Sequence, residues 1–173
     1  MTYLLAQISQ LLTTSPGNLV YHLVLAFALM AGLQAVIIQR GPDNRPAVQR
    51  YLTGFSILLA GQAILFISSA LAWQRVIDAQ QFLPVIDRAV TAISILWLAW
   101  MWATPQPHQI ADAAIVVLTL VLLLFGGISI ALWVPQVGLS SFNRSAIDQS
   151  WAVIDLLILL SAIAGILYQR KAN

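Results

Sequence analysis

Ionisable side chains inside the apolar part of the chain are the residues that could do chemistry. Asp155 follows Asp148 by seven residues, so both carboxylates lie on one face of a helix, about 10 Å apart along its axis, with Trp151 between them. A charge at the centre of a membrane span costs about 2.5–3.5 kcal/mol on insertion scales. Asp155 is too deep to cap a helix. We therefore expect it to pair with Arg88, a cation in the unfavourable first turn of another predicted span.

His22 lies near the same predicted end of the first span and could join this group. One hypothesis is a pocket open to the outside that binds a small polar or amphiphilic ligand, or a proton. The other hypothesis is a buried ion pair that sets the register of the helices. The predicted ligand-binding residues are Asp155, Arg88, Asp148, Trp151 and His22. We predict no catalytic residue, no metal site and no cofactor.

The composition places these residues in an integral membrane protein. Of 173 residues, 60% are hydrophobic and 8% are charged, against about 25% charged in soluble domains. The absence of cysteine excludes disulfides and thiolate metal sites. The only lysine, Lys171, is at the extreme end, which excludes a Schiff base inside the membrane. A net charge of +2 gives no reason to expect nucleic acid as a partner.

Five apolar stretches are long enough to cross a bilayer as helices, which takes about 20 residues each. We therefore predict an all-α fold, an integral membrane bundle of five transmembrane helices that forms one domain over residues 18–173. The linkers are short and no internal repeat is visible. The predicted spans are Leu19–Ile38, Tyr51–Trp73, Pro84–Ala103, Ala111–Trp133 and Asp148–Tyr168.

Residues 1–17 have apolar side chains at helical spacing and no basic region typical of a signal peptide. We predict an amphipathic helix at the membrane interface, with a frayed tail as the alternative. The positive-inside rule predicts an N-terminus outside and a C-terminus in the cytoplasm. The predicted inner loops carry Arg40, Arg45, Arg50, Arg170 and Lys171, against Arg75, Arg88 and Arg144 on the other side.

The other aspartates have structural explanations. Asp87, Asp112 and Asp148 fall in the first turns of predicted helices, where the helix dipole favours a carboxylate. Ser145 and Asp148 have the spacing of a capping signal. The tryptophans near the ends of the spans predict an aromatic belt with indole N–H groups reaching water: Trp73, Trp97, Trp100, Trp102 and Trp133.

Two stretches, "LPVIDRAVTAISILWLAWMWATPQPHQIADAA" and "FNRSAIDQSWAVIDL", resemble the multi-pass N-terminal membrane region of bacterial histidine kinases and GAF-domain signalling proteins. The resemblance covers residues 19–170 and implies that the last span passes a signal to a cytoplasmic domain. The chain ends soon after that span, so the resemblance implies an isolated sensor region or a stand-alone relative. The matching positions are Pro84, Asp87, Arg88, Trp97, Asp112, Phe142, Asn143, Asp148 and Trp151.

The resulting function hypothesis is a non-catalytic sensory or regulatory module, multi-pass in the inner membrane of a bacterium. Its expected partners are the lipid bilayer and a fused or separate cytoplasmic signalling domain, and the sequence is compatible with a homodimer. The alternative is a small structural accessory subunit of a larger membrane complex. Proton movement through Asp155 ranks third, because five spans cannot divide into two equal inverted repeats.

Overall fold

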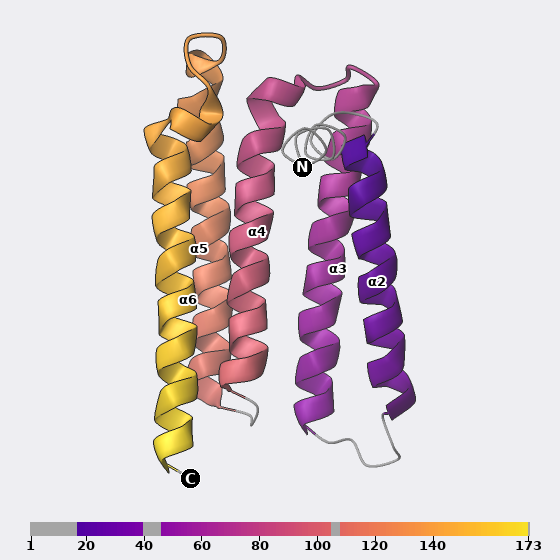
Figure 1. Ribbon diagram of the computed structural model, residues 1–173, viewed down its shortest axis with the longest axis vertical. Helices are drawn as coiled ribbons and strands as arrows, with labels where there is room; N and C mark the ends of the chain where they lie inside the picture. The colour runs from indigo at the N-terminus through magenta and orange to yellow at the C-terminus, as the bar shows by residue number, and fades with distance from the viewer. Residues whose placement is uncertain (1–16, 40–45, 105–107, 173) are drawn as a thin grey trace, which may run out of the picture.

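The computed structural model describes residues 17–39, 46–104 and 108–172, and almost all of them are helical (Figure 1). Two short 3-10 helices lie between the fourth and fifth long helices. The elements are α2 (Gly17–Gln39), α3 (Pro46–Trp73), α4 (Ala79–Ala103), α5 (Gln109–Trp133), η1 (Val134–Gln136), η2 (Phe142–Arg144) and α6 (Ala146–Ala172).

All five long helices are long and apolar enough to cross a membrane, which confirms the predicted all-α architecture of five candidate spans. Many of their large apolar side chains are exposed on the outside of the bundle, as in Phe27, Leu124 and Leu157. This arrangement suits lipid as the solvent, because hydrocarbon does not penalise exposed apolar surface. The predicted interfacial segment lies outside the described residues, except for Gly17, the first residue of α2.

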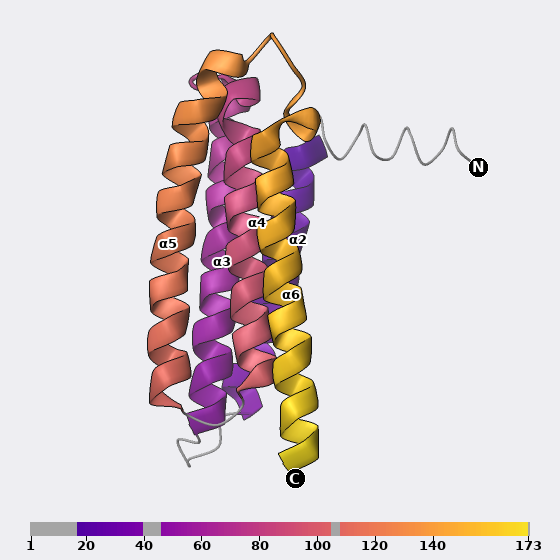
Figure 2. The ribbon, with the colours of Figure 1, turned by 90° about the vertical axis from the view of Figure 1, so that its left-hand side faces the viewer.

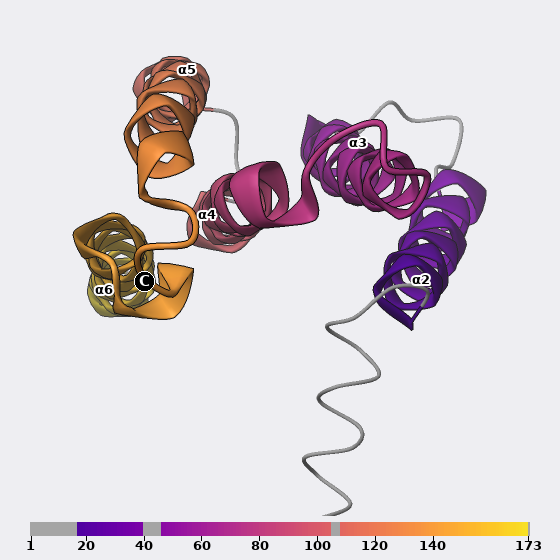
Figure 3. The same cartoon turned by 90° about the horizontal axis from the view of Figure 1, so that it is seen from above.

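α4 is the central helix of the bundle and packs against α3, α5 and α6, whereas α2 packs against α3 (Figure 3). The helices alternate in direction along the chain, so α4 and α6 run parallel to each other (Figure 2). We call the end with connections 74–78 and 134–145 the loop end. The tail end is the opposite one, where α6 finishes (Figure 1).

Two glycines let α3 approach α4 closely. A Cβ atom added to Gly54 would lie 2.7 Å from Cγ of Met101, and one added to Gly61 would lie 2.9 Å from Cγ1 of Val90. Met101 and Val90 are both buried. Small residues at such contacts allow the backbones to come together, which matters in a bilayer because packing drives helix association there.

We expect Gly54→Ala to lower the free energy of unfolding by about 1–3 kcal/mol, because the added methyl group overpacks the contact with buried Met101. SDS titration in mixed micelles measures this change. Gly127→Ala is the matched control, since a Cβ atom there meets nothing within 4 Å. Equal stability of the two variants would contradict close packing of α3 on α4.

The start of α4 differs from the prediction. The helix begins at Ala79, with Asp78 as its N-cap residue accepting a hydrogen bond from the Gln80 N–H at 2.8 Å. The predictions that Pro84 opens the helix and that Asp87 and Arg88 lie in its first turn are therefore wrong. Asp78 caps the helix ahead of the apolar stretch, so a prediction from hydropathy alone places the start of the helix too late.

Trp133 supplies a hydrogen bond in place of the one that Pro84 removes from α4. Proline has no N–H, so the carbonyl of Gln80, four residues earlier, loses its usual helical donor. The Trp133 indole N–H donates to that carbonyl at 2.8 Å, and its ring packs edge-on against Phe142. Trp133 is buried, so its predicted place in a water-facing belt is wrong, whereas Trp73 is exposed.

Candidate functional site

An ion pair joins α4 to α6 near the loop end. Arg88 Nε donates to Oδ1 of Asp148 at 2.7 Å, and Asp148 is buried while about a third of the Arg88 side chain is exposed. The Asp148 backbone N–H in turn donates to Ser145 Oγ at 3.1 Å, which confirms the predicted capping contact. The Ser145 hydroxyl thus caps the start of α6 at the Asp148 backbone, while Arg88 of α4 binds the Asp148 carboxylate.

The predicted pairing of Arg88 with Asp155 is wrong, because Arg88 forms an ion pair with Asp148. Helical side chains lean toward the N-terminus of their own helix. Since α4 starts at the loop end, the Arg88 side chain extends toward that end, where Asp148 lies, and not deeper into the bundle. Asp155 remains within electrostatic range of both members of the pair.

Two polar atoms on the buried side of α6 have no hydrogen-bond partner among the described residues. They are the indole nitrogen of Trp151 and Oδ1 of Asp155, one helical turn apart on the same face. Trp151 is 0% exposed and packs edge-on against Phe125 of α5, with ring centroids 4.8 Å apart. Arg88, Asp148, Trp151 and Asp155 form what we call the loop-end cluster.

The structure places His22 with a different partner. Its Nδ1 lies 3.1 Å from Oε1 of Gln62 on α3, and its ring packs against Tyr21. His22 has no described hydrogen bond or ion pair with the loop-end cluster. It acts electrostatically on Asp87, the residue before Arg88, so the two adjacent side chains of α4 interact with different parts of the bundle.

A second polar cluster at the tail end was missed by the sequence reasoning. Arg50 is 6% exposed and forms an ion pair with Asp112 of α5. It also donates to the backbone oxygen of Thr104 and to Thr104 Oγ1, the latter at 2.9 Å. The guanidinium carbon lies 4.5 Å from the centre of the Trp100 ring, whose N–H donates to Asp112 at 3.0 Å.

These four residues, which we call the tail-end clamp, connect α3 with the end of α4 and the start of α5. The prediction that Arg50 lies in a loop is wrong, because α3 begins at Pro46 and includes it. Proline is favoured in the first helical position, and this signal could have placed Arg50 inside the helix. Trp97 and Trp100 likewise donate to protein oxygens, those of Thr119 and Asp112, so the prediction that their indole N–H groups reach water is wrong.

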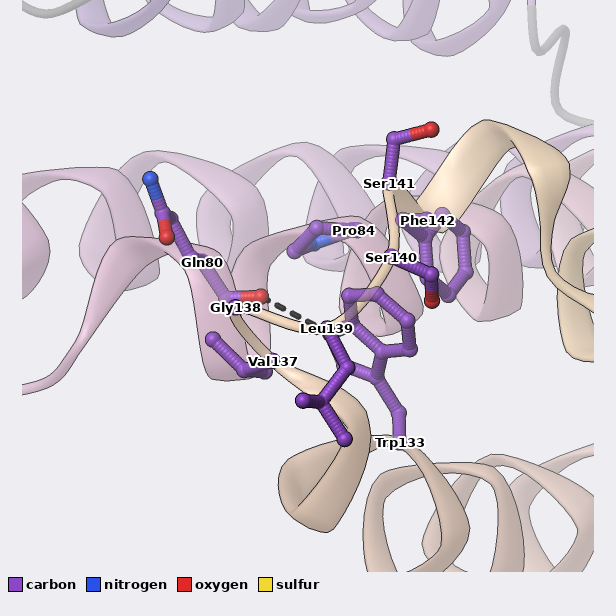
Figure 4. A pocket seen from close by; sticks show the side chains of 9 residues that line it. All are labelled: Gln80, Pro84, Trp133, Val137, Gly138, Leu139, Ser140, Ser141 and Phe142. Atoms are coloured by element: carbon purple, nitrogen blue, oxygen red, sulfur yellow. Dashed lines mark hydrogen bonds between the residues drawn. The ribbon is translucent and has the colours of Figure 1, made fainter.

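An open hollow of about 510 Å³ lies at the loop end, between the start of α4 and the segment that joins α5 to α6 (Figure 4). Its wall includes Pro84, Trp133 and the loop from Val137 to Phe142. None of the residues of the loop-end cluster lines it. A second hollow, of about 460 Å³, is formed by apolar side chains of α2 with Gln34 and Leu59.

In the part of the chain that the structure describes, no three His, Asp or Glu side chains are grouped as ligands for a metal ion. No protein-family model, no curated protein and no solved structure matches this chain. Any function must therefore be argued from the two polar clusters and from the way in which they hold the helices.

Proposed function

We propose that the chain is a non-catalytic sensory or regulatory module of a bacterial membrane signalling protein, with α6 as the element that carries the signal. One observation supports this proposal above the others. Among the residues of α6 whose burial is described, the buried ones, Ile147, Asp148 and Trp151, lie in its first two turns. From Ala152 to Tyr168 no residue is fully buried.

A helix held in this way can change its tilt when its anchored end is disturbed. The tail-end clamp holds α3, α4 and α5 together at the opposite end and does not include α6. A ligand that altered the Arg88–Asp148 pair would therefore move the tail end of α6 relative to the other helices. Such a response requires different affinities of the ligand for the two positions of α6.

The proposed orientation places the loop end outside the cell and the tail end in the cytoplasm, with the inner membrane as the location. The signal would then pass to a fused or separate cytoplasmic partner beyond α6. The resemblance to membrane regions of histidine kinases and GAF-domain proteins supports this direction. A small polar or amphiphilic ligand reaching Arg88, about a third of which is exposed, would be the input.

Disulfide cross-linking at the tail end tests the proposal, and the chain contains no native cysteine to interfere. A Cβ atom added to Gly165 of α6 would lie 3.5 Å from the Cβ atom of Ala103 of α4. This separation suits a disulfide, which needs about 3.5–4.5 Å. We expect Ala103→Cys/Gly165→Cys to cross-link readily, and the addition of Arg88→Gln to slow the reaction several-fold.

Arg144→Gln is the matched control, because Arg144 is an exposed arginine at the same end of the bundle. Equal cross-linking rates with Arg88→Gln and Arg144→Gln would show that the loop-end pair does not control α6, and would overturn the proposal. A fixed partner recovered in stoichiometric amounts after mild detergent extraction, together with equal rates, would favour the accessory-subunit alternative.

A further inference from the structure

Asp155 carries a carboxyl group near the middle of a span, and the proposed movement of α6 does not use it. In the candidate span Ala146–Tyr168, Asp155 lies nine residues from one end and thirteen from the other. At 1.5 Å per residue it is about 14 Å below the start of the helix. One of its oxygens is buried without a partner among the described residues, while the residue as a whole is half-buried.

The charges around Asp155 do not compensate a negative charge there. Arg88 of α4 and Asp148 of α6 are the charged groups that act on it, and they are bound to each other. Their charges therefore cancel to a first approximation. Asp87, beside Arg88, interacts with His22 and Arg88 and is not among the charged groups that act on Asp155.

Trp151 adds an independent observation at the same place. It is 0% exposed, its indole N–H has no acceptor within the described ranges, and it lies one turn nearer the loop end than Asp155. The bulk of its ring stands between Asp148 and Asp155 along this face of α6. Two neighbouring polar groups on this face of α6 are thus buried without a partner among the described residues.

We propose that Asp155 holds a proton in the folded protein and forms an intramembrane acid site that is open to lipid-soluble reagents. An unpaired carboxylate in a medium of low dielectric is far less stable than the neutral acid, so such a group takes up a proton. The ligand of this site is the proton itself. Asp148 lies only about 10 Å away, at about 1.5 Å per residue, and differs in that its carboxylate binds Arg88.

Dicyclohexylcarbodiimide distinguishes the two carboxyl groups, because it reacts with protonated carboxylic acids. The acid proton passes to a nitrogen of the reagent, and the carboxyl oxygen bonds to its central carbon. The product rearranges to a stable N-acylurea, and no atom is lost. We expect purified protein in lipid vesicles at neutral pH to gain the full mass of the reagent on Asp155, with no adduct on Asp148 and none in Asp155→Asn.

Infrared spectroscopy provides a second measurement that does not depend on access of the reagent. We expect the difference between wild type and Asp155→Asn to show loss of one carbonyl band of a protonated acid, and this band should shift in D2O. An adduct on Asp148 with none on Asp155 would overturn the proposal, as would a difference spectrum without an acid band. An acid band without an adduct would show that Asp155 is protonated, and would overturn the claim that lipid-soluble reagents reach it.

These outcomes do not depend on the proposed signalling role. Cross-linking of α6 reports on the Arg88–Asp148 pair, whereas the adduct and the acid band report on Asp155 alone. The acid site could therefore be present in a protein whose α6 does not move. Conversely, an ionised Asp155 would leave the proposed movement of α6 unchanged.

Discussion

Asp112→Asn is expected to lower the free energy of unfolding by about 3 kcal/mol, because it leaves the Arg50 guanidinium buried without its carboxylate. Breaking a buried ion pair by removing one partner typically costs about 3–5 kcal/mol. We expect the lower end of this range, since the Asp112 side chain is 41% exposed and Thr104 still accepts from Arg50. SDS titration in mixed micelles, followed by circular dichroism, measures the change.

Asp78→Asn provides the matched control for this substitution. Asp78 is exposed and caps α4 through its side chain, and asparagine caps a helix about as well as aspartate. We therefore expect little change in stability. If Asp112→Asn were as stable as Asp78→Asn, Arg50 would have to reach water or another acceptor, and the tail-end clamp would not hold the bundle.

Trp151→Ala is expected to cost about 3 kcal/mol and to loosen α6 from α4 and α5. Trp→Ala in a packed core costs about 3–5 kcal/mol, from lost contacts and from the cavity left behind. In lipid the hydrophobic term is small, so the loss comes from packing against neighbours such as Phe125, and the lower figure applies. The disulfide between Ala103→Cys and Gly165→Cys should form more slowly in the same variant.

Trp102→Ala separates this packing effect from a general effect of losing an indole. Trp102 is 66% exposed on α4, against 0% for Trp151, so its removal leaves no internal cavity. We expect its stability to stay within about 0.5 kcal/mol of the parent, as is usual for surface substitutions. Equal losses in the two variants would mean that Trp151 does not anchor α6.

The two polar clusters lie at opposite ends of the bundle and join different helices. At the tail end, Arg50 of α3 binds Thr104 and Asp112, and so joins three helices. At the loop end, Arg88 of α4 binds Asp148 and joins α6 to the same central helix. Because α6 lacks a polar anchor at the tail end among its described residues, it can change position there more readily than α3, α4 and α5, which the clamp joins.

The depth of Asp155 could be read from the sequence, whereas Arg50, Asp87 and Arg88 lie deeper in their helices than predicted. No partner of these side chains could be read from the sequence. Asp155 was correctly recognised as the carboxylate that no helix start explains. Its expected partner was Arg88, which binds Asp148 instead because its side chain leans toward the start of α4. His22 was expected beside the same residues, yet it faces Gln62 of α3.

The five apolar helices follow from the sequence by itself, because a bilayer selects each span by its own length and hydrophobicity, one segment at a time. The starts of α3 and α4 could also have been predicted from local signals, namely Pro46 in the first helical position and Asp78 as an N-cap residue. Only the tertiary structure decided which polar groups meet. Arg50 and Asp112 are 62 residues apart, and their contact depends on how three helices pack and rotate against one another, which no local pattern encodes.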